Sequence, residues 1–313
     1  MVNFRYHLVS LTAVFLALAV GIALGAGPLR DSISMSLSGE AAELRTLNAK
    51  LQGQLAGQAA ADEWNATVLD QLAEDLTQQS LTGQQITIIS QHPVDSAEVD
   101  QVIQALSGAG GEVVSAVTLA ERWFDPGQHS FRSALGSSLL THLSTDPANT
   151  TSTDVLLATA LAESLTVGDT AGGAGLAQEA GIISALLSDG ELTVLDQAPT
   201  GAAGVVVVIL SGASLNENTT VSGALSVQLE AISAVAPTIA VALDDAGREE
   251  VLQIRASAQV TGTVTTLTNG SSAAGLLALP LAISQHLQGE IAHYGVENDA
   301  TSAFPPVRLV RQQ

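Results

Sequence analysis

The hydrophobic pattern of the chain begins with one long apolar run. Residues 8–27 read LVSLTAVFLALAVGIALGAG, a stretch without a charged residue in which only Ser10 and Thr12 are polar. At about 1.5 Å per residue, a helix of this length spans a hydrocarbon core of about 30 Å. No second run of this length and purity follows. The pattern therefore predicts a single-pass membrane protein with a transmembrane helix at residues 8–29.

The charges that flank this run predict its orientation. Arg5 and His7 precede the run, whereas Arg30 is offset at once by the aspartate that follows it. The positive-inside rule then places a tip at residues 1–7 in the cytoplasm and the bulk of the chain outside the cytoplasmic membrane. A cleaved signal peptide is the alternative, because residues 23–25 (ALG) resemble a small-residue cleavage site. The apolar region of a signal peptide normally has about 7–15 residues, so we favour an uncleaved anchor.

Two glycines inside the run bear on helix pairing. Gly21 and Gly25 form a G-x-x-x-G pair, a spacing that lets two transmembrane helices approach closely. Glycine is also common in membrane helices in general, so a chance occurrence is the alternative. We expect the pair to contribute to a homodimer within the membrane.

Residues 31–80 have the pattern of a long amphipathic helix. The segment has no proline and few β-branched residues, and its leucines recur at the heptad spacing of a coiled-coil seam. These seam leucines are Leu37, Leu44, Leu47 and Leu51. Polar residues occupy two seam positions, and the register slips once in the middle of the segment. We expect residues 31–80 to form a parallel coiled coil between two copies, with an amphipathic helix that folds back on the globular domain as the alternative.

After residue 83 the pattern changes to short apolar runs that alternate with helical segments. Such alternation is typical of a doubly wound α/β domain, in which helices cover both faces of a mostly parallel sheet. We expect this domain at residues 84–296, followed by a C-terminal tail at residues 297–313. The predicted strands are 85–90, 112–118, 192–195, 205–210, 238–243 and 261–267, and the predicted helices are 95–108, 130–143, 153–167, 174–188, 221–235, 244–256 and 273–287.

Composition and charge exclude several classes of function. The chain has 313 residues, of which 46% are apolar, enough for a sizeable core. Its 10 Lys and Arg residues against 31 Asp and Glu residues give a net charge of −21. A surface this acidic repels phosphate backbones, so we expect no nucleic-acid partner. The absence of cysteine excludes disulfides, thiolate metal sites and cysteine nucleophiles.

Motifs for nucleotide binding and for hydrolysis are also missing. No G-x-G-x-x-G follows a predicted strand, and the sole lysine, Lys50, lies in the predicted coiled coil rather than in a phosphate-binding loop. The G-x-S-x-G turn of α/β hydrolases is absent as well. We therefore expect a non-catalytic protein without a cofactor.

One group of residues has the types that bind a transition metal. His286, Glu290 and His293 are spaced so that a continuous helix would place all three on one face, and two imidazoles with a carboxylate suit Zn(II) or Cu(II). Gly289 interrupts such a helix, and apart from Met35 no internal sulfur ligand is available for Cu(I). We keep the three residues as a weak metal candidate and expect packed or capping histidines instead.

Three stretches of the chain together resemble a known family. They are the opening MVNFRYHLVSLTAVFLALAVGIALG, the leucine-bearing segment that follows it, and QGEIAHYG at residues 288–295. On these stretches the chain is similar to the actinobacterial MctB/SteB group. The resemblance implies a membrane helix, a coiled coil and an extracytoplasmic α/β domain. It also implies one of two functions: copper efflux across the envelope, or control of cell separation together with a SteA-like membrane partner and a RipA-like peptidoglycan hydrolase.

The residues bear on the choice between these two functions. A pore needs a closed barrel or several spans, and this chain has one apolar run and only 3% aromatic residues. Direct handling of copper would favour Met or Cys ligands, which are nearly missing. We therefore expect a membrane-anchored protein that binds cell-envelope partners in cell separation, through a surface near residues 76–95. Copper transport is the alternative, and copper is a ligand only under that alternative.

Overall fold

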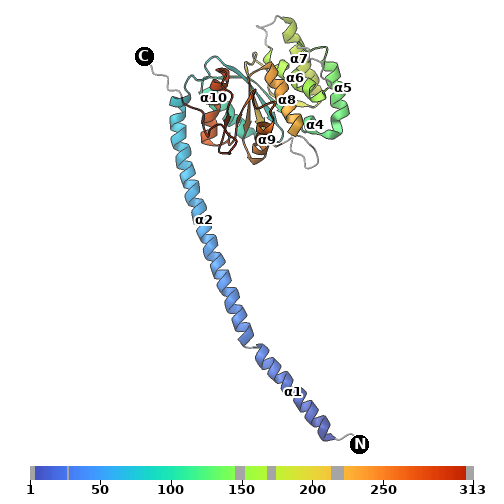
Figure 1. Cartoon of the computed structure of the whole chain (residues 1–313), viewed down its shortest axis with the longest axis vertical. Helices are drawn as coiled ribbons and strands as arrows, with labels where there is room; N and C mark the ends of the chain where they lie inside the picture. Colours follow the sequence, from blue (N-terminus) through green and yellow to red (C-terminus); the bar gives the residue numbers. More distant parts are fainter. Residues whose placement is uncertain (1–3, 27, 145–151, 168–173, 213–221, 308–313) are drawn as a thin grey trace. The chain divides into compact units, whose positions relative to one another are not determined.

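The structure is a computed structural model that describes residues 4–26, 28–144, 152–167, 174–212 and 222–307 (Figure 1). The chain divides into two compact units, an N-terminal unit at residues 1–65 and an α/β unit at residues 66–313. The boundary falls within the long helix α2, so the last turns of this helix belong to the α/β unit.

The N-terminal unit contains the predicted apolar helix. Helix α1, Phe4–Ala26, includes a fully exposed stretch, Phe4–Ala23, that is long and apolar enough to cross a membrane, and it is the one such helix among the described residues. The hydroxyl of Thr12 donates a hydrogen bond to the carbonyl of Leu8, so this polar group is satisfied within the helix, as a membrane interior requires. The helix fits a membrane anchor, whereas its orientation and its retention after synthesis stay predictions.

Helix α2, Pro28–Thr77, is 50 residues long and begins with a proline, which suits the first turn of a helix. The side chains of Leu44, Leu47 and Leu51 are 65%, 50% and 50% exposed, so the described part of this single chain leaves the predicted seam uncovered. The side chain of Leu37 lies outside the described part. The predicted long helix is confirmed, and its pairing with a second copy stays a prediction.

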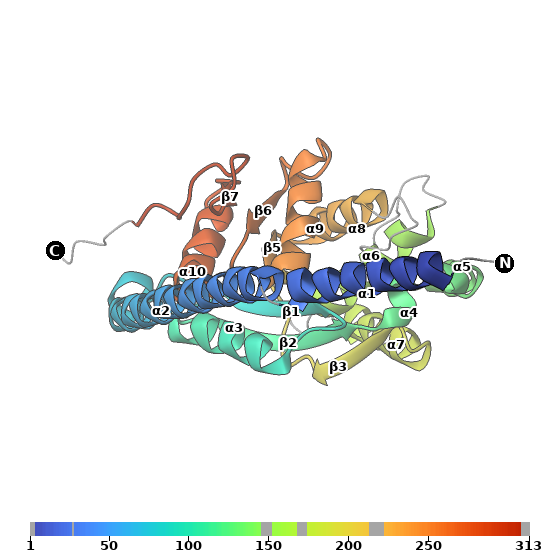
Figure 2. The ribbon, with the colours of Figure 1, turned by 90° about the horizontal axis from the view of Figure 1, so that it is seen from below.

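The α/β unit is built on a seven-stranded sheet with the order β3-β2-β1-β4-β5-β6-β7, which Figure 2 shows from edge to edge. Neighbouring strands are parallel except for β3, which runs antiparallel to β2. The predicted mostly parallel sheet is therefore confirmed. The strands are β1 Gln85–Gln91, β2 Glu112–Leu119, β3 Thr193–Gln197, β4 Val205–Leu210, β5 Thr238–Ala242, β6 Val264–Leu267 and β7 His293–Tyr294.

Helices cover both faces of this sheet, because the side chains of a strand alternate between the two faces. On β4, Val205 and Val207 pack in one core cluster with α3 and α10, whereas Val206 and Val208 pack in a second cluster with α6, α8 and α9. A strand buried on both faces needs a continuous apolar run, which β4 has. The helices are α3 Ser96–Gly108, α4 Glu121–Phe124, α5 His129–Leu139, α6 Thr153–Thr166, α7 Ala174–Asp189, α8 Ser222–Val235, α9 Asp245–Ala256 and α10 Ala273–Leu287, with a 3-10 turn at Pro126–Gln128.

Helices α9 and α10 begin in close contact with the carboxyl ends of the strands. Asp244 caps α9 by accepting a hydrogen bond from the backbone N–H of Gly247 at 2.7 Å, and Ser272 caps α10 by accepting one from Gly275 at 3.0 Å. A Cβ atom at either glycine would lie 2.1 Å from a backbone carbonyl oxygen. Glycine at these two positions therefore allows the helix N-termini to approach this edge of the sheet.

The chain beyond β7 stays on the α/β unit as far as the structure describes it. Ser302 forms a bridge with Tyr294, Phe304 packs against the core cluster beneath α10, and Pro305 is buried. We expected residues 297–313 to form a tail along the surface. Their described part lies at the β7 end of the sheet and is mostly exposed, and residues 308–313 lie outside the described residues.

Candidate functional site

The three residues of the weak metal candidate do not share a helix face. Helix α10 ends at Leu287, and Gly289 follows in a left-handed conformation with φ of +86°. Glu290 therefore lies beyond the helix, and His293 begins strand β7. Gly289, which interrupts the helical pattern in the sequence, thus follows directly after the end of α10.

The two histidines instead bind adjacent threonines of β6. Nδ1 of His286 lies 2.8 Å from the hydroxyl oxygen of Thr265, and Nδ1 of His293 lies 2.9 Å from that of Thr266. Adjacent residues of a strand point to opposite faces of the sheet. The two imidazoles therefore lie on opposite faces of the sheet, and strand β6 separates them, so they cannot bind one ion together.

Burial lowers the pKa of His286, and burial together with the nearby Arg255 lowers the pKa of His293. Both rings are thus held in the neutral form, which suits a packed, hydrogen-bonding histidine. The described residues include no group of three or more His, Cys, Asp or Glu side chains close enough to hold a metal ion.

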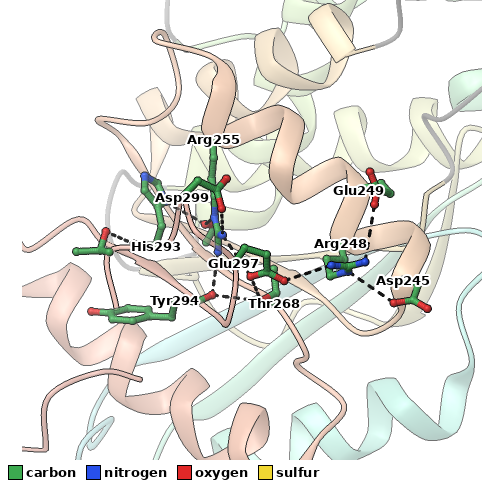
Figure 3. Close-up of polar contacts among 11 residues, drawn as sticks. Asp245, Arg248, Glu249, Arg255, Thr268, His293, Tyr294, Glu297 and Asp299 are labelled. Carbon is green, nitrogen blue, oxygen red and sulfur yellow. Dashed lines mark hydrogen bonds and ion pairs between the residues drawn. The ribbon is translucent and has the colours of Figure 1, made fainter. Parts of the chain in front are cut away.

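A buried ion cluster surrounds Arg255, at the end of α9 (Figure 3). The side chain of Arg255 is only 2% exposed. Its Nε donates to the hydroxyl of Thr266 at 2.8 Å, its Nη2 donates to the carbonyl of Tyr294 at 2.8 Å, and its Nη1 donates to Asp299 at 3.1 Å. One guanidinium therefore joins α9, β6, β7 and the segment that follows β7.

Glu297 is the second buried charge of this cluster. Its carboxylate, in a side chain only 9% exposed, lies 3.5 Å from Nη1 of Arg255 and accepts a hydrogen bond from Thr268 at 2.9 Å. Arg248, which is one-third exposed, lies 3.7 Å from the other oxygen of this carboxylate. Because buried charges need partners of opposite sign, the cluster fixes the segment after β7 in one place.

Sequence reasoning missed this cluster, although the sequence contains one signal for it. In α9, Val251 and Ile254 are buried at helical spacing, and Arg255 falls on the same buried face. An arginine at a core position requires a buried acid as its partner. The sequence alone does not say which of the 31 acidic residues supplies it.

A second polar link holds the same segment against α10. The hydroxyl of the buried Tyr294 donates a hydrogen bond to the side-chain oxygen of Gln285, and the side-chain nitrogen of Gln285 donates to the carbonyl of Pro306 at 3.0 Å. Burial, with a smaller contribution from Glu290, raises the pKa of Tyr294. The phenol therefore remains a hydrogen-bond donor at physiological pH.

The strand order of the sheet reverses between β1 and β4. Open α/β sheets bind ligands at the carboxyl ends of the strands at such a point, so the ends of β1 and β4 form a second candidate site. The side-chain oxygen of Gln91 accepts a hydrogen bond from the backbone N–H of Ser211 at 3.0 Å and so joins the two strand ends. Burial, followed by the charges of Asp95 and Asp244, raises the pKa of the nearby Glu98. Three acidic side chains, Glu98, Asp95 and Asp244, thus lie near this edge and disfavour phosphates and other anions.

A groove of about 670 Å³ lies between the last turns of α2 and the helices α3 and α10. We call it the α3–α10 groove; Leu69 and Ala73 of α2, Gln104 and Ala105 of α3, and Leu276 of α10 line it. All of these residues belong to the α/β unit. The full lining is mostly apolar, with two glutamines, Thr77 and one charged side chain, Asp70. Of the partner surface that we expected near residues 76–95, only Thr77 lines this groove, and that expectation stays a prediction.

Comparisons with known proteins agree on one family. The family model described as "Copper transport outer membrane protein, MctB" matches residues 1–305. The copper transporter MctB of Mycobacterium tuberculosis H37Rv is 28% identical over 316 residues, covering 96% of this chain and 98% of the relative. The copper transporter MctB of Mycobacterium leprae is 29% identical over 323 residues, covering 98% of this chain and 100% of the relative. Because the match takes in the apolar helix, the long helix and the α/β unit alike, this chain belongs to the MctB family.

Proposed function

We propose that this chain takes part in copper transport across the cell envelope as a membrane-anchored, non-catalytic protein that works through a protein partner. The observation that carries the proposal is the family match over residues 1–305, with relatives named copper transporters over nearly their whole length. From the sequence we ranked cell separation first. The comparisons favour the alternative that we ranked second.

Our reason for including a partner is that one helix of the described residues is long and apolar enough to cross a membrane. An ion that crosses a membrane requires a path lined by polar groups. The described span of this chain offers the hydroxyls of Ser10 and Thr12, and that of Thr12 is already bonded within the helix. The two methionines, Met1 and Met35, have side chains outside the described part. A partner that supplies the path would give this chain the role of an anchor and an adaptor.

The α3–α10 groove is the surface that we assign to this partner. Its volume is about 670 Å³, and its walls are the last turns of α2 together with α3 and α10. Ala105 lines the groove from α3, whereas Ala97 is exposed at the start of the same helix and does not line it. These two alanines allow a matched pair of substitutions.

The test is copper content in a host that lacks the gene. We expect deletion to raise cell-associated copper, measured by mass spectrometry, and to increase sensitivity to copper in the medium. The full chain and the control variant Ala97→Trp should restore both, whereas Ala105→Trp, which fills the groove, should not. Normal copper content in the deletion strain would contradict copper transport, and full complementation by Ala105→Trp would contradict the role of the groove.

Cell separation is the second candidate function. The uncovered leucines of α2 favour it, because a helix with exposed Leu44, Leu47 and Leu51 has a surface for a helical envelope partner. Under this candidate the chain would act with a SteA-like membrane protein and a RipA-like hydrolase. Chains of unseparated cells in the deletion strain, with unchanged copper content, would support it.

A further inference from the structure

A groove lies next to the edge strand β3. Strand β3 is the last strand on its side of the sheet, and α7 packs beside it (Figure 2). Leu195 of β3, helix α7, the end of α6 and residues 199–202 enclose a space of about 720 Å³, which we call the edge groove. Its lining includes Leu195 of β3 and, from α7, Ala177, Gly181, Ser184, Ser188 and Asp189. An edge strand beside a helix is the arrangement in which several domains bind an extended peptide as an added strand.

The side chains of α7 leave room for another backbone in this groove. Every residue that α7 contributes before its last position is alanine, glycine or serine. A Cβ atom at Gly181 would have no neighbour within 4 Å, so the space in front of it is open. On the other wall, the side chain of Leu195 of β3 is apolar and 40% exposed, which is unusual for an edge strand left in water. The groove therefore suits an extended peptide with small or apolar side chains.

The charge of the groove selects a basic peptide. Asp189 is its one charged lining residue, and it ends α7, where the helix dipole adds partial negative charge. The chain itself contains a segment of the matching chemistry, VRLVRQQ at residues 307–313. Arg308 and Arg311 are two of only 10 basic residues, and no acidic residue follows Asp299.

We propose that the edge groove binds residues 307–313 of a second copy of this chain, extended and antiparallel to β3. Alternate residues of a strand share one face, so Leu309 and Arg311 point the same way. In the antiparallel direction Leu309 faces Leu195 and the small side chains of α7, and Arg311 reaches Asp189, which lies just before the start of β3. The outer N–H and C=O groups of β3 pair with the backbone of the added segment.

The segment comes from a second copy because its own groove is out of reach. Pro306 is held by Gln285 of α10, at the β6–β7 end of the sheet and on the face opposite α7. β3 lies five or six strand spacings away, about 24–29 Å at about 4.8 Å per spacing. Placing the last four residues in the groove would leave residues 307–309, about 10 Å of extended chain, to cover that distance. The contact is therefore intermolecular, and it does not depend on copper transport.

A peptide-binding experiment tests the groove. The probe is a fluorescein-labelled peptide of residues 304–313. Its anisotropy is measured as it is titrated with a variant of the chain that ends at Val307, held in detergent micelles. We expect saturable binding that weakens as salt rises, because a charge pair contributes. Gly181→Leu should weaken it at least tenfold, whereas Gly175→Leu should leave it unchanged, since Gly175 is a second α7 glycine with open space that does not line the groove.

A peptide with Arg311→Glu should also bind at least tenfold more weakly. Lack of binding at 1 mM peptide, or binding that Gly181→Leu leaves unchanged, would overturn the proposal. Circular dichroism of both glycine variants checks that α7 and the fold persist.

A disulfide experiment tests whether the contact joins two copies. The chain has no cysteine, so single substitutions give an unambiguous cross-link. We expect a mixture of Ser184→Cys chains and Leu309→Cys chains to form a disulfide-linked dimer on mild oxidation. Ser137→Cys, at an exposed serine of α5, should not cross-link with Leu309→Cys. Cross-linking that occurs only when both cysteines are in one chain, or equally with the control, would refute an intermolecular strand.

Discussion

Replacement of Arg255 by methionine should strongly destabilise the α/β unit. Methionine has a similar length and no charge, so the change removes the hydrogen bonds to Thr266, Tyr294 and Asp299 while keeping much of the volume. It also leaves the 9%-exposed Glu297 without its buried partner. Breaking a buried ion pair by removing one member costs about 3–5 kcal/mol, because the remaining charge stays desolvated. For a unit of this size that is a fall in Tm of about 6–20 °C.

Tryptophan fluorescence can follow this unfolding within the full chain. The chain has two tryptophans: Trp123 is buried in the α/β unit and Trp64 is exposed on α2. A Trp64→Phe background therefore leaves Trp123 as the reporter of the α/β unit. Urea titration in this background gives the free energy of unfolding for each variant.

Two comparisons make the reasoning refutable. Arg248→Met removes an arginine that is one-third exposed and should cost less than about 1 kcal/mol. Adding Glu297→Gln to Arg255→Met should recover stability, because it removes the stranded buried charge while leaving an amide that can accept from Thr268. If Arg255→Met costs no more than Arg248→Met, or if Glu297→Gln brings no recovery, the cluster does not hold the segment after β7 in the way we describe.

Three further predictions concern pH, packing and assembly. Because the pKa values of His286 and His293 are lowered in the folded chain, the unfolded chain binds protons first as the pH falls. The free energy of unfolding should therefore decrease as the pH drops below about 6.5. His286→Gln with His293→Gln should flatten this dependence, measured by urea titrations at pH 5 and pH 7.5. Gly247→Ala should destabilise the unit by about 1–3 kcal/mol in the same assay, because its Cβ would lie 2.1 Å from a backbone oxygen; an unchanged free energy would show that α9 can shift. Leu44→Asp with Leu51→Asp should convert the detergent-solubilised chain from dimer to monomer, as measured by sedimentation. Each leucine buried between the two helices of a coiled coil would contribute about 1.5–3 kcal/mol. A monomer before any substitution would contradict the coiled coil.

Local patterns predicted most of the secondary structure. The strand at Val205–Leu210 and the helix at Ala273–Leu287 were both placed from the sequence with the bounds that the structure has. Both are long apolar segments bounded by glycine or polar residues, where pattern and burial agree. The two-residue strand β7 was missed, because two residues cannot show a period. The antiparallel direction of β3 was missed because nothing local sets it.

The Arg255 cluster was missed for a different reason. Its partners Tyr294, Glu297 and Asp299 are about 40 positions further along the chain, and only the packed sheet brings them to α9. The histidine pair shows the limit of spacing, because only a continuous helix would have placed His286 and His293 on one face. The helix end at Gly289 and the alternation along β6 separate them. Site geometry of this kind depends on tertiary contacts, which periodicity does not encode.

Membership of the MctB family and a single apolar helix together constrain how this chain can serve transport. Among the described residues one helix is long and apolar enough to cross a membrane, and such a helix satisfies its backbone hydrogen bonds internally, so our transport proposal includes further chains in the bilayer. The acidic charge of −21 raises the local concentration of cations and of basic partners near the chain without providing a tight ion site. In the described part of the chain, the surfaces to which we assign partners are the exposed leucines of α2, the α3–α10 groove and the edge groove, and each partner is a polypeptide. We therefore expect copper specificity to come from the assembled partner, so that copper binding by this chain alone, titrated with Cu(II) and anaerobically with Cu(I), should be weaker than about 1 μM. Tighter binding lost with His286→Ala and His293→Ala would assign the ion to this chain instead.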